Sequence, residues 1–527
     1  SHPRQLGGRP ASAASGTLGM EQLVRTVPLP TACRAFHVGN GAPRCFGAIG
    51  FAGFLVLRHG SRCRRPVPHS AKPRPPIVSR RAAVDVAWTP GDQDTRTFGS
   101  VAEYADHLAR EGVLPDGFRV GSTKLTFSPV ESELVAEAEM RLTLILLDAP
   151  TDQYALVFTA NAFPGCPVRV GKRRLKQGAP LQAVIINNKV SNVCPGGDGE
   201  AASESICAAV AQEVSLSGGA QAVLPSSTGV IGWRLPVSEM ISAVPRVMST
   251  LQAESAVPAA EGIMTTDRYP KVVSAELPGG ARIVAFAKGA GMIEPRMATM
   301  LCYILTDADL PCDRGVLQEM LRKAVAVSFN AVSVDGDEST SDTVALFSSR
   351  KTACSDLVAF EHALLRICLD LAQQLVRNGE GTEHVMRVSV TGARDDAMAL
   401  QIGRAVANGP LFKCAVAGND PNVGRLVGKV GQVLGLLGEA DRASNAIFRI
   451  GGQTIFEKGQ FTIDDKQEAE LSKHLRNAEM NAELSYPPHF RVVDVEVQLG
   501  GGGDGCAVML GSDLTEGYVR CNADYRS

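Results

Sequence analysis

A glycine-rich loop ending on a threonine lies between two segments that are typical of buried strands. The segments, residues 281–287 (ARIVAFA) and residues 300–305, are short and apolar, the first with β-branched residues. Gly289 and Gly291 give the loop backbone freedom and Pro295 fixes one φ angle, which suits a peptide bond held under strain. Thr299 stands at the rigid end of this loop.

The position of Thr299 suggests a nucleophile that the chain could create by cutting itself. A threonine hydroxyl is a weak nucleophile unless a base takes its proton, and a freed α-amino group on the same residue has a pKa near neutrality. Attack of the Thr299 hydroxyl on the preceding peptide bond, Ala298-Thr299, would free that amino group. Taken alone this pattern is weak, because a threonine that begins a buried strand is usually structural. The surrounding motifs decide its meaning.

The first 84 residues differ in composition from the rest. They carry 13 Lys or Arg against one acid, with Ser and Pro, which is typical of organelle transit peptides and predicts a disordered targeting region outside the fold. The apolar run at residues 45–57 is too short for a membrane span, and an Arg/Pro-rich stretch follows it. The order suggests bipartite targeting to a complex plastid, and a mitochondrial presequence stays open. The mature protein is expected in the plastid stroma or the mitochondrial matrix, outside any membrane.

The rest of the chain is acidic and soluble in character. It holds 14 more acidic than basic residues, which argues against a nucleic-acid partner, because phosphate contacts need a basic surface. With 527 residues and 45% hydrophobic residues, the chain can bury a large core. Its 13 cysteines include no Cys-x-x-Cys pair, so neither a zinc site nor a disulfide framework is supported, and Cys302 is interpreted as a buried free thiol.

Strand-like and helix-like segments alternate after the head, which predicts helices packed on sheets in layers. The expected strands are residues 142–147, 183–186, 272–275 and 385–390. The expected helices are residues 203–214, 314–328, 355–377 and 466–480. The clearest helix is 355–377, where Ser355 is the expected N-cap and one face is apolar, formed by Phe360, Leu364, Ile367, Leu371 and Leu375.

Several motifs together resemble the glutamate N-acetyltransferase family, also called ornithine acetyltransferase, of the arginine pathway. They occur in the family's order, from about Gly117 to the last residue: VFTANAFPGCPV (157–168), SSTGVIG (226–232), GIMTTDRYPK (262–271), KGAGMIEPRMATML (288–301), SFNAVSVDGDESTSDT (328–343), AVAGNDPNVGR (415–425) and DLTEGYVRCNADYRS (513–527). The resemblance implies the family's α/β fold, similar to self-processing aminopeptidases. It also implies cleavage at Ala298-Thr299 into an N-terminal chain, residues 85–298, and a C-terminal chain, residues 299–527.

The same resemblance assigns the catalytic groups. Thr299 matches the nucleophile, and Thr228 with Gly229 match the pair that forms the oxyanion hole. Acyl transfer passes through a tetrahedral oxyanion, so a hydroxyl and a backbone N–H placed on it lower the barrier. Without the resemblance, the SSTG segment would be an ordinary turn.

Further positions match substrate-binding residues of the family. Lys288 is expected to bind a substrate carboxylate, and a threonine of the pair Thr265-Thr266 to bind the same ligand, with Thr265 favoured and Thr266 open. Glu380 in NGEGTEH is expected to meet the cationic amine of ornithine. The remaining matches are the terminal pair Asn522 and Ser527, which predict a tail folded into the site. Three acids in VDGDESTSD lack the spacing of a calcium loop and are interpreted as polar turns near the site: Asp335, Asp337 and Asp342.

The predicted reaction moves an acetyl group from N2-acetylornithine to glutamate through acetyl-Thr299, without a metal or an organic cofactor. The two cleaved chains are expected to stay together as a heterodimer, assembled into a heterotetramer. Whether acetyl-CoA also serves as donor stays open. Two alternatives are an N-terminal-nucleophile aminopeptidase or amidase, in which water is the acceptor, and an unprocessed homologue that acts as a binding protein.

Three departures from the family pattern bear on these predictions. Glu294 and Arg296 replace smaller residues of the cleavage loop, which predicts slower self-cleavage. The segment NNKVSNVCPG (187–196) replaces a small Gly and a polar Asn by Lys189 and Val190, so the loop near the site could differ in shape. Val423 stands where the family usually has Trp, which predicts a change of packing.

Overall fold

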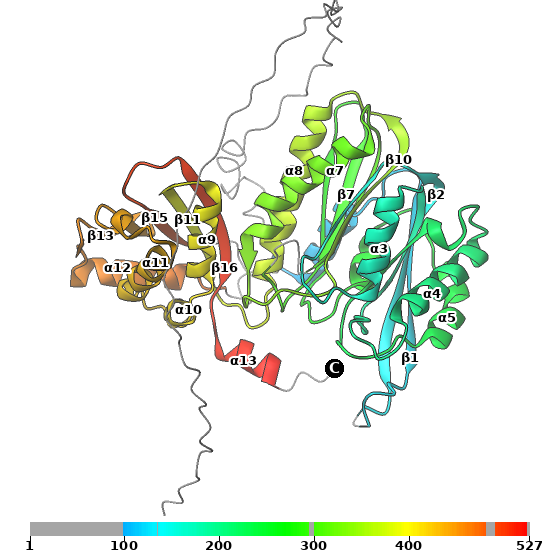
Figure 1. Ribbon diagram of the computed structural model, residues 1–527, viewed down its shortest axis with the longest axis horizontal. Helices are drawn as coiled ribbons and strands as arrows, with labels where there is room; N and C mark the ends of the chain where they lie inside the picture. Colours follow the sequence, from blue (N-terminus) through cyan, green and yellow to red (C-terminus); the bar gives the residue numbers. More distant parts are fainter. Residues whose placement is uncertain (1–97, 134, 295–299, 481–490, 524–527) are drawn as a thin grey trace, which may run out of the picture. The chain divides into compact units, whose positions relative to one another are not determined.

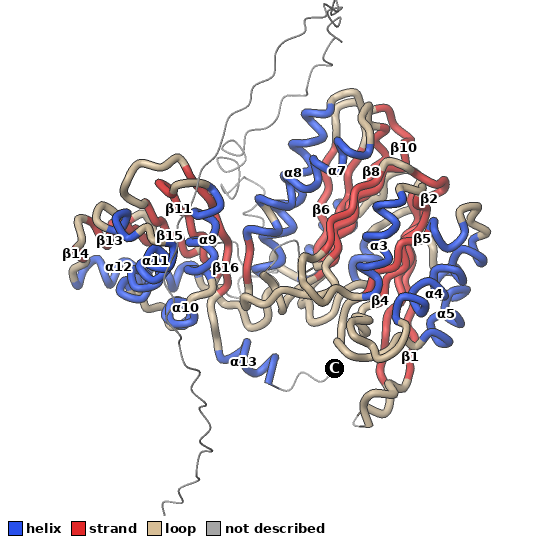
Figure 2. The backbone as a smooth tube through the Cα atoms, viewed as in Figure 1, coloured by secondary structure: helices blue, strands red, loops and turns tan. Residues whose placement is uncertain are grey.

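The computed structural model of this protein describes residues 98–133, 135–294, 300–480 and 491–523. These residues all belong to one compact unit, in which three β-sheets carry helices on their faces (Figures 1 and 2). The predicted targeting region, residues 1–84, lies outside the described residues. So do the cleavage pair Ala298 and Thr299, Arg296, and Ser527.

The first two sheets are built by the segments that flank the candidate site. The four-stranded sheet has the order β1 (Phe118–Phe127), β2 (Ala138–Thr151), β4 (Leu181–Asn187) and β5 (Val223–Ser227). The five-stranded sheet has the order β3 (Tyr154–Phe158), β10 (Thr343–Ala353), β8 (Leu301–Asp309), β7 (Arg282–Lys288) and β6 (Lys271–Glu276). Strand β8 runs antiparallel to β7 and parallel to β10.

The strand sequences explain why these two sheets pack face to face. Successive side chains of a strand point to opposite faces, so a strand that is apolar throughout must be covered on both sides. In β8, Leu301, Tyr303 and Leu305 pack into a cluster shared with the four-stranded sheet. The intervening Cys302 and Ile304 join a different cluster on the outer face.

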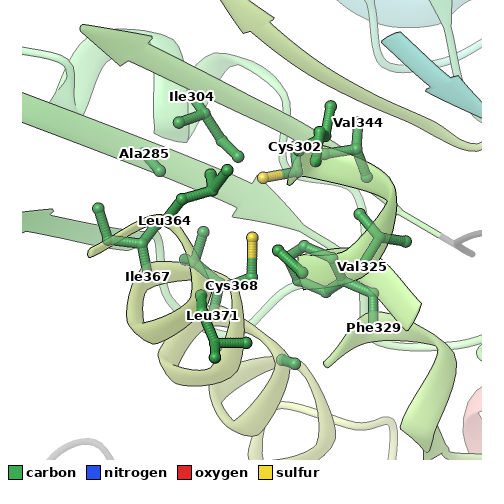
Figure 3. Packing of buried hydrophobic residues seen from close by; sticks show 14 of the residues in the cluster. Ala285, Cys302, Ile304, Val325, Phe329, Val344, Leu364, Ile367, Cys368 and Leu371 are labelled. Carbon is green, nitrogen blue, oxygen red and sulfur yellow. The ribbon is translucent and has the colours of Figure 1, made fainter. Parts of the chain in front are cut away.

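Helices cover the two outer faces and complete four layers. Helices α7 (Arg314–Val327) and α8 (Leu357–Arg377) lie on the five-stranded sheet, and their apolar contacts with it are shown in Figure 3. Helices α4 (Gly199–Val214) and α5 (Val237–Ser249) cover the four-stranded sheet. Three further helices contact the sheets: α2 (Val101–Glu111) contacts β6, α3 (Cys166–Gln177) contacts β5, and α6 (Val257–Gly262) contacts β1 and β2.

The third sheet has seven strands and a separate apolar cluster. Its order is β14 (Gln460–Phe461), β13 (Gln453–Glu457), β12 (Ile447–Ile450), β15 (Val493–Gln498), β11 (Val385–Ala393), β16 (Gly505–Ser512) and β9 (Val332–Ser333). The cluster includes residues of α9 (Asp396–Ala407), α10 (Pro410–Ala417), α11 (Val423–Leu437) and α12 (Asp465–Ala478). The chain then leaves β16 and forms α13 (Glu516–Ala523), drawn in red in Figure 1.

The predicted elements are confirmed in type and approximate extent, with one wrong cap. The expected strands fall within β2, β4, β6 and β11 or begin one residue before β7 and β8, and all expected helices fall within or around α4, α7, α8 and α12. The N-cap of α8 is Asp356 rather than Ser355. Its carboxylate accepts hydrogen bonds from the N–H groups of Val358 (3.1 Å) and Ala359 (2.9 Å), and a negative charge is favoured at a helix N-terminus. The apolar face of the helix is buried as expected.

Other expectations from the sequence concern membrane spans, metal sites and cysteines. Within the described ranges, no helix is long and apolar enough to cross a membrane, and no group of three or more His, Cys, Asp or Glu is arranged to hold a metal ion. The described cysteines are free thiols. Cys302 is fully buried near Cys368 (Figure 3), and burial raises the pKa of the Cys302 thiol well above its usual value. Val423 is buried at the start of α11.

Candidate active site

A cavity of about 170 Å³ gathers most of the residues that the sequence singled out. It is lined by segments that lie far apart in the chain, and the predicted residues among its lining are Thr228, Gly229, Thr265, Thr266, Lys288, Glu380 and Asn522. Met300 and Leu301, which directly follow the predicted nucleophile, also line it. The cavity therefore lies at the start of β8. Thr299 and Ser527 lie outside the described residues.

The turn after β5 presents a backbone donor. The N–H of Thr228 donates to the Asn187 carbonyl (3.0 Å) and the N–H of Val230 to the Lys189 carbonyl (2.9 Å). Between them, the N–H of Gly229 has no acceptor among the described residues. Gly229 has φ +120°, and a side chain added there would lie 2.2 Å from the Lys189 backbone. The turn thus requires glycine at this position.

The altered segment 187–196 forms the other side of this turn. Val190 is fully buried and bridges to Val230, while the Lys189 backbone packs against Gly229. The Lys189 side chain is half-buried, and burial lowers its pKa. The atoms of residue 189 that lie nearest to Gly229 belong to its backbone.

Lys288 ends β7 as a buried cation. Its side chain is 9% exposed, and its Nζ donates to Thr265 Oγ1 at 3.4 Å. Burial lowers its pKa, and the carboxylates of Asp267, Asp342 and Glu380 oppose that shift. A buried lysine beside a hydroxyl at a cavity wall is suited to bind a carboxylate.

Asp267 connects the walls around Lys288, and sequence reasoning missed it. Its Oδ1 accepts from the Lys271 Nζ (2.5 Å) and from the Gly289 N–H (2.8 Å), and its Oδ2 accepts from the Thr265 N–H (3.0 Å). Burial alone would raise its pKa, but the charges of Lys271 and Lys288 and the Gly289 bond lower it, so the carboxyl is ionised. Its place directly after the threonine pair in MTTD was an available signal.

Glu380 joins two distant segments at the cavity. Its Oε1 accepts from the Thr266 hydroxyl (2.6 Å), and its Oε2 accepts from the Asn522 side-chain amide (2.9 Å). A side chain on Gly291 would come within 2.4 Å of this carboxylate, so glycine there leaves room for it. Asn522 lies on α13, and the tail therefore reaches the cavity at least as far as this residue.

The described part of the cleavage loop is fixed by two acids. Asp335 accepts from the N–H groups of Met292 (2.6 Å) and Ile293 (2.8 Å). Glu294 forms an ion pair with Arg404 on α9 (2.8 Å). Two of the acids in VDGDESTSD, interpreted above as polar turns near the site, can be placed more closely. Asp335 holds the loop, and the third acid, Asp342, is buried and lines the cavity.

His384 and Asp513 form a buried pair, which no sequence pattern predicted. His384 Nδ1 is 2.8 Å from Asp513 Oδ2, and its Nε2 is 3.2 Å from Asn419 Oδ1. Burial lowers the pKa of His384, but its bonds to Asp513 and Asn419 outweigh burial and raise it overall. The Asp513 Oδ1 also accepts from the Glu383 N–H (3.1 Å). The pair joins the base of the Glu380 loop to the segment that leads into α13.

Comparison with known proteins identifies the family. The ArgJ family model matches residues 127–527, and the chain belongs to the ArgJ family. It is 37% identical over 420 residues to the arginine biosynthesis bifunctional protein ArgJ of Nitratidesulfovibrio vulgaris, covering 78% of this chain and 99% of that protein. It is 38% identical over 396 residues to the glutamate N-acetyltransferase of Methanosarcina acetivorans, covering 73% and 94%.

A solved structure is similar to part of the chain. The ornithine acetyltransferase of Mycobacterium tuberculosis, solved in complex with ornithine, is 33% identical, with a TM-score of 0.31 over 36% of this chain and 96% of that chain. The resemblance inferred from the motifs is thus confirmed at the level of the family. The layered α/β fold is confirmed by the sheets and helices described above.

Proposed function

We propose that this protein is a glutamate N-acetyltransferase of arginine biosynthesis, which moves an acetyl group from N2-acetylornithine to glutamate. The proposal rests on one observation, the cavity at the start of β8. It combines a backbone donor at Gly229, a buried cation at Lys288 and a carboxylate at Glu380. Membership of the ArgJ family supports the reaction.

The nucleophile is Thr299, freed by self-cleavage. Its hydroxyl attacks the Ala298 carbonyl, the peptide bond becomes an ester, and water hydrolyses the ester to leave a carboxylate on residue 298 and an amino group on residue 299. Strands β7 and β8 come from opposite sides of the cut and pair in one sheet. This pairing supports a heterodimer of residues 85–298 and 299–527 that stays together. We further propose that two of each chain form the assembled enzyme.

Acetyl transfer then proceeds in two half-reactions. The Thr299 hydroxyl attacks the acetyl carbonyl of N2-acetylornithine while its own amino group takes the proton. The Thr228 hydroxyl and the Gly229 N–H stabilise the oxyanion, and ornithine leaves with the proton on its amine. The amine of glutamate next attacks the acetyl ester, which gives N-acetylglutamate and restores Thr299.

The remaining cavity residues bind the substrates. Lys288 pairs with the α-carboxylate that both substrates share, and Thr265, within hydrogen-bond distance of its Nζ, binds the same group. Glu380 pairs with the side-chain amine of ornithine, while Thr266 and Asn522 fix its two oxygens. We further propose that Ser527 completes the site and that residues 1–84 direct the protein to a plastid or a mitochondrion.

The test is a product assay on the purified protein. With N2-acetylornithine and glutamate, ornithine and N-acetylglutamate should form in equal amounts, and Thr299→Ala should form neither. Release of acetate in the absence of glutamate, at a rate equal to that of transfer, would favour a hydrolase instead. A parallel reaction with acetyl-CoA and glutamate decides whether acetyl-CoA is a second donor.

A further inference from the structure

The last residue of β4 is a buried asparagine whose side chain binds two separate segments. Asn187 is 1% exposed, and its Nδ2 donates to the Ser227 Oγ at 2.6 Å. Its Oδ1 accepts from the backbone N–H of Val190 at 3.1 Å and from that of Lys189 at 3.4 Å. A backbone N–H can only donate, so these two contacts decide which end of the amide faces which segment. Both polar atoms of the Asn187 side chain are therefore paired.

The two segments are the sides of the turn that carries the proposed oxyanion donor. The Asn187 carbonyl accepts from the Thr228 N–H (3.0 Å), and the Lys189 carbonyl accepts from the Val230 N–H (2.9 Å). Gly229, whose N–H has no acceptor among the described residues, lies between these two bonds. One bond is thus made by the backbone of Asn187. The other is made by a residue whose N–H the Asn187 side chain holds.

The turn leaves little room for movement of the segment that the asparagine holds. A Cβ added at Gly229 would lie 2.2 Å from the Lys189 carbonyl carbon, so the two backbones are in close contact. The Oδ1 of Asn187 binds backbone N–H groups, and these do not depend on which side chains stand at positions 189 and 190. The departures from the family pattern at Lys189 and Val190 therefore leave these bonds intact.

We propose that Asn187 is a positioning residue of the oxyanion hole, and that its side chain fixes the direction of the Gly229 N–H by holding the Lys189-Val190 backbone against the turn. The inference rests on the proposed function. Among the described residues, those that line the cavity do not include Asn187, so it acts through the turn and not on the substrate.

Loss of this side chain should loosen the turn without removing a substrate contact. In Asn187→Ala two backbone N–H groups lose their acceptor, and the Lys189 segment is freed to move away from Gly229. We expect kcat to fall by on the order of tenfold. The loss should be smaller than the factor of about 10² to 10³ typical of a missing donor, because the residue 187 carbonyl still binds the Thr228 N–H. KM should change less than about twofold, because the oxyanion forms only in the transition state.

Asn192 provides a matched control in the same segment. It is also buried, and its Nδ2 donates to the Gly199 carbonyl (2.8 Å) and the Ser203 Oγ (3.0 Å) on α4 instead of to the turn. It has φ +54°, which is unfavourable for alanine. Asn192→Ala should therefore lose at least as much stability as Asn187→Ala, while its kcat stays within about twofold of wild type.

Two further variants separate positioning from general packing. Ser227→Ala removes only the partner of the Asn187 Nδ2, so it is the milder change and should lower kcat a few-fold. In a Gly229→Ala background the donor is already displaced, so addition of Asn187→Ala should lower kcat by less than a further factor of about two. For each variant, cleavage is followed on denaturing gels, kcat and KM for N2-acetylornithine are measured per cleaved chain, and unfolding is recorded in urea.

The proposal is overturned if kcat of Asn187→Ala equals that of Asn192→Ala, if KM alone changes, or if the effects of Asn187→Ala and Gly229→Ala multiply in full. A folded Asn187→Ala chain that stays uncut also contradicts it, because the side chain would then be needed before acetyl transfer begins. If Asn187→Ala does not fold, Ser227→Ala decides, and an unchanged kcat there counts against the proposal. A wild-type chain that transfers no acetyl group, or a cleaved Gly229→Ala enzyme with full kcat, would instead remove the proposed function or its oxyanion hole, and this inference with it.

Discussion

The proposed oxyanion hole, in the turn after β5, can be tested with a single substitution, because one added methyl group should disable it. In Gly229→Ala the new Cβ would lie 2.2 Å from both the carbonyl carbon and the oxygen of Lys189. These are backbone atoms of a segment that is bonded to the turn on both sides, through the Thr228 and Val230 N–H groups. Relief of the clash to ordinary contact at 3.4 Å or more requires the turn to move by about 1 Å.

That displacement sets the expected size of the effect. A donor moved by about 1 Å from a developing oxyanion is largely lost, and loss of one such donor lowers kcat by about 10² to 10³, or about 2.7 to 4 kcal/mol. The alanine also adopts an unfavourable φ of +120°, which costs about 1 to 3 kcal/mol of stability. This loss of stability is not specific to the active site, so its effect on kcat needs a control.

Gly232 provides the control within the same loop. It has φ +90°, and a side chain added there meets nothing within 4 Å. Gly232→Ala should therefore lose similar stability but keep kcat within a few-fold, when acetyl transfer is measured after cleavage has been verified and thermal unfolding has been recorded for both variants. Equal kcat values for the two variants, both fully cleaved, would refute the placement of the oxyanion hole.

Three further predictions follow from the same geometry. Thr299→Ala should run as one uncut band on a denaturing gel where the wild type gives two. Two bands in the variant would show that Thr299 is not the nucleophile of self-cleavage. Gly291→Ala should displace the Glu380 carboxylate and raise KM for N2-acetylornithine about as much as Glu380→Gln does, with kcat changed less; an unchanged KM in both variants would contradict the assignment. The raised pKa of His384 means that its charged form adds stability below about pH 6.5, which is lost as pH rises through the folded-state pKa. The difference in unfolding free energy between wild type and His384→Gln should therefore shrink across that range in urea titrations, and a difference that grows with pH would refute the pairing.

The fold was predictable where the sequence is periodic. The apolar runs that became β7 and β8 are buried on both faces, and the 3.6-residue pattern of α8 identified its buried face correctly. The error at Ser355 arose because two adjacent residues can both cap a helix, and only the hydrogen bonds show which one does. That two sheets pack face to face could not be predicted, because apolar strands do not reveal which surface covers each of their faces.

Some residues of the candidate site could be predicted from the sequence, and others could not. Thr228, Lys288, Glu380 and Asn522 could be named because they stand in motifs that resemble a known family, and the structure brings them to one cavity. The residues that hold them could not, because their contacts join distant positions. Asp335, for example, binds the backbone 43 residues earlier at Met292, and no local pattern signals such a bond.

The central claim is that an acetyl group passes through Thr299, and trapping that intermediate tests it most directly. The cleaved enzyme would be incubated with N2-acetylornithine in the absence of glutamate, denatured in acid, digested and analysed by mass spectrometry. We predict the added mass of one acetyl group on the hydroxyl of the N-terminal Thr299 of the C-terminal chain, and its disappearance when glutamate is added before denaturation. An enzyme that transfers acetyl at full rate while Thr299 stays unmodified, or carries the label on another residue, would contradict the account.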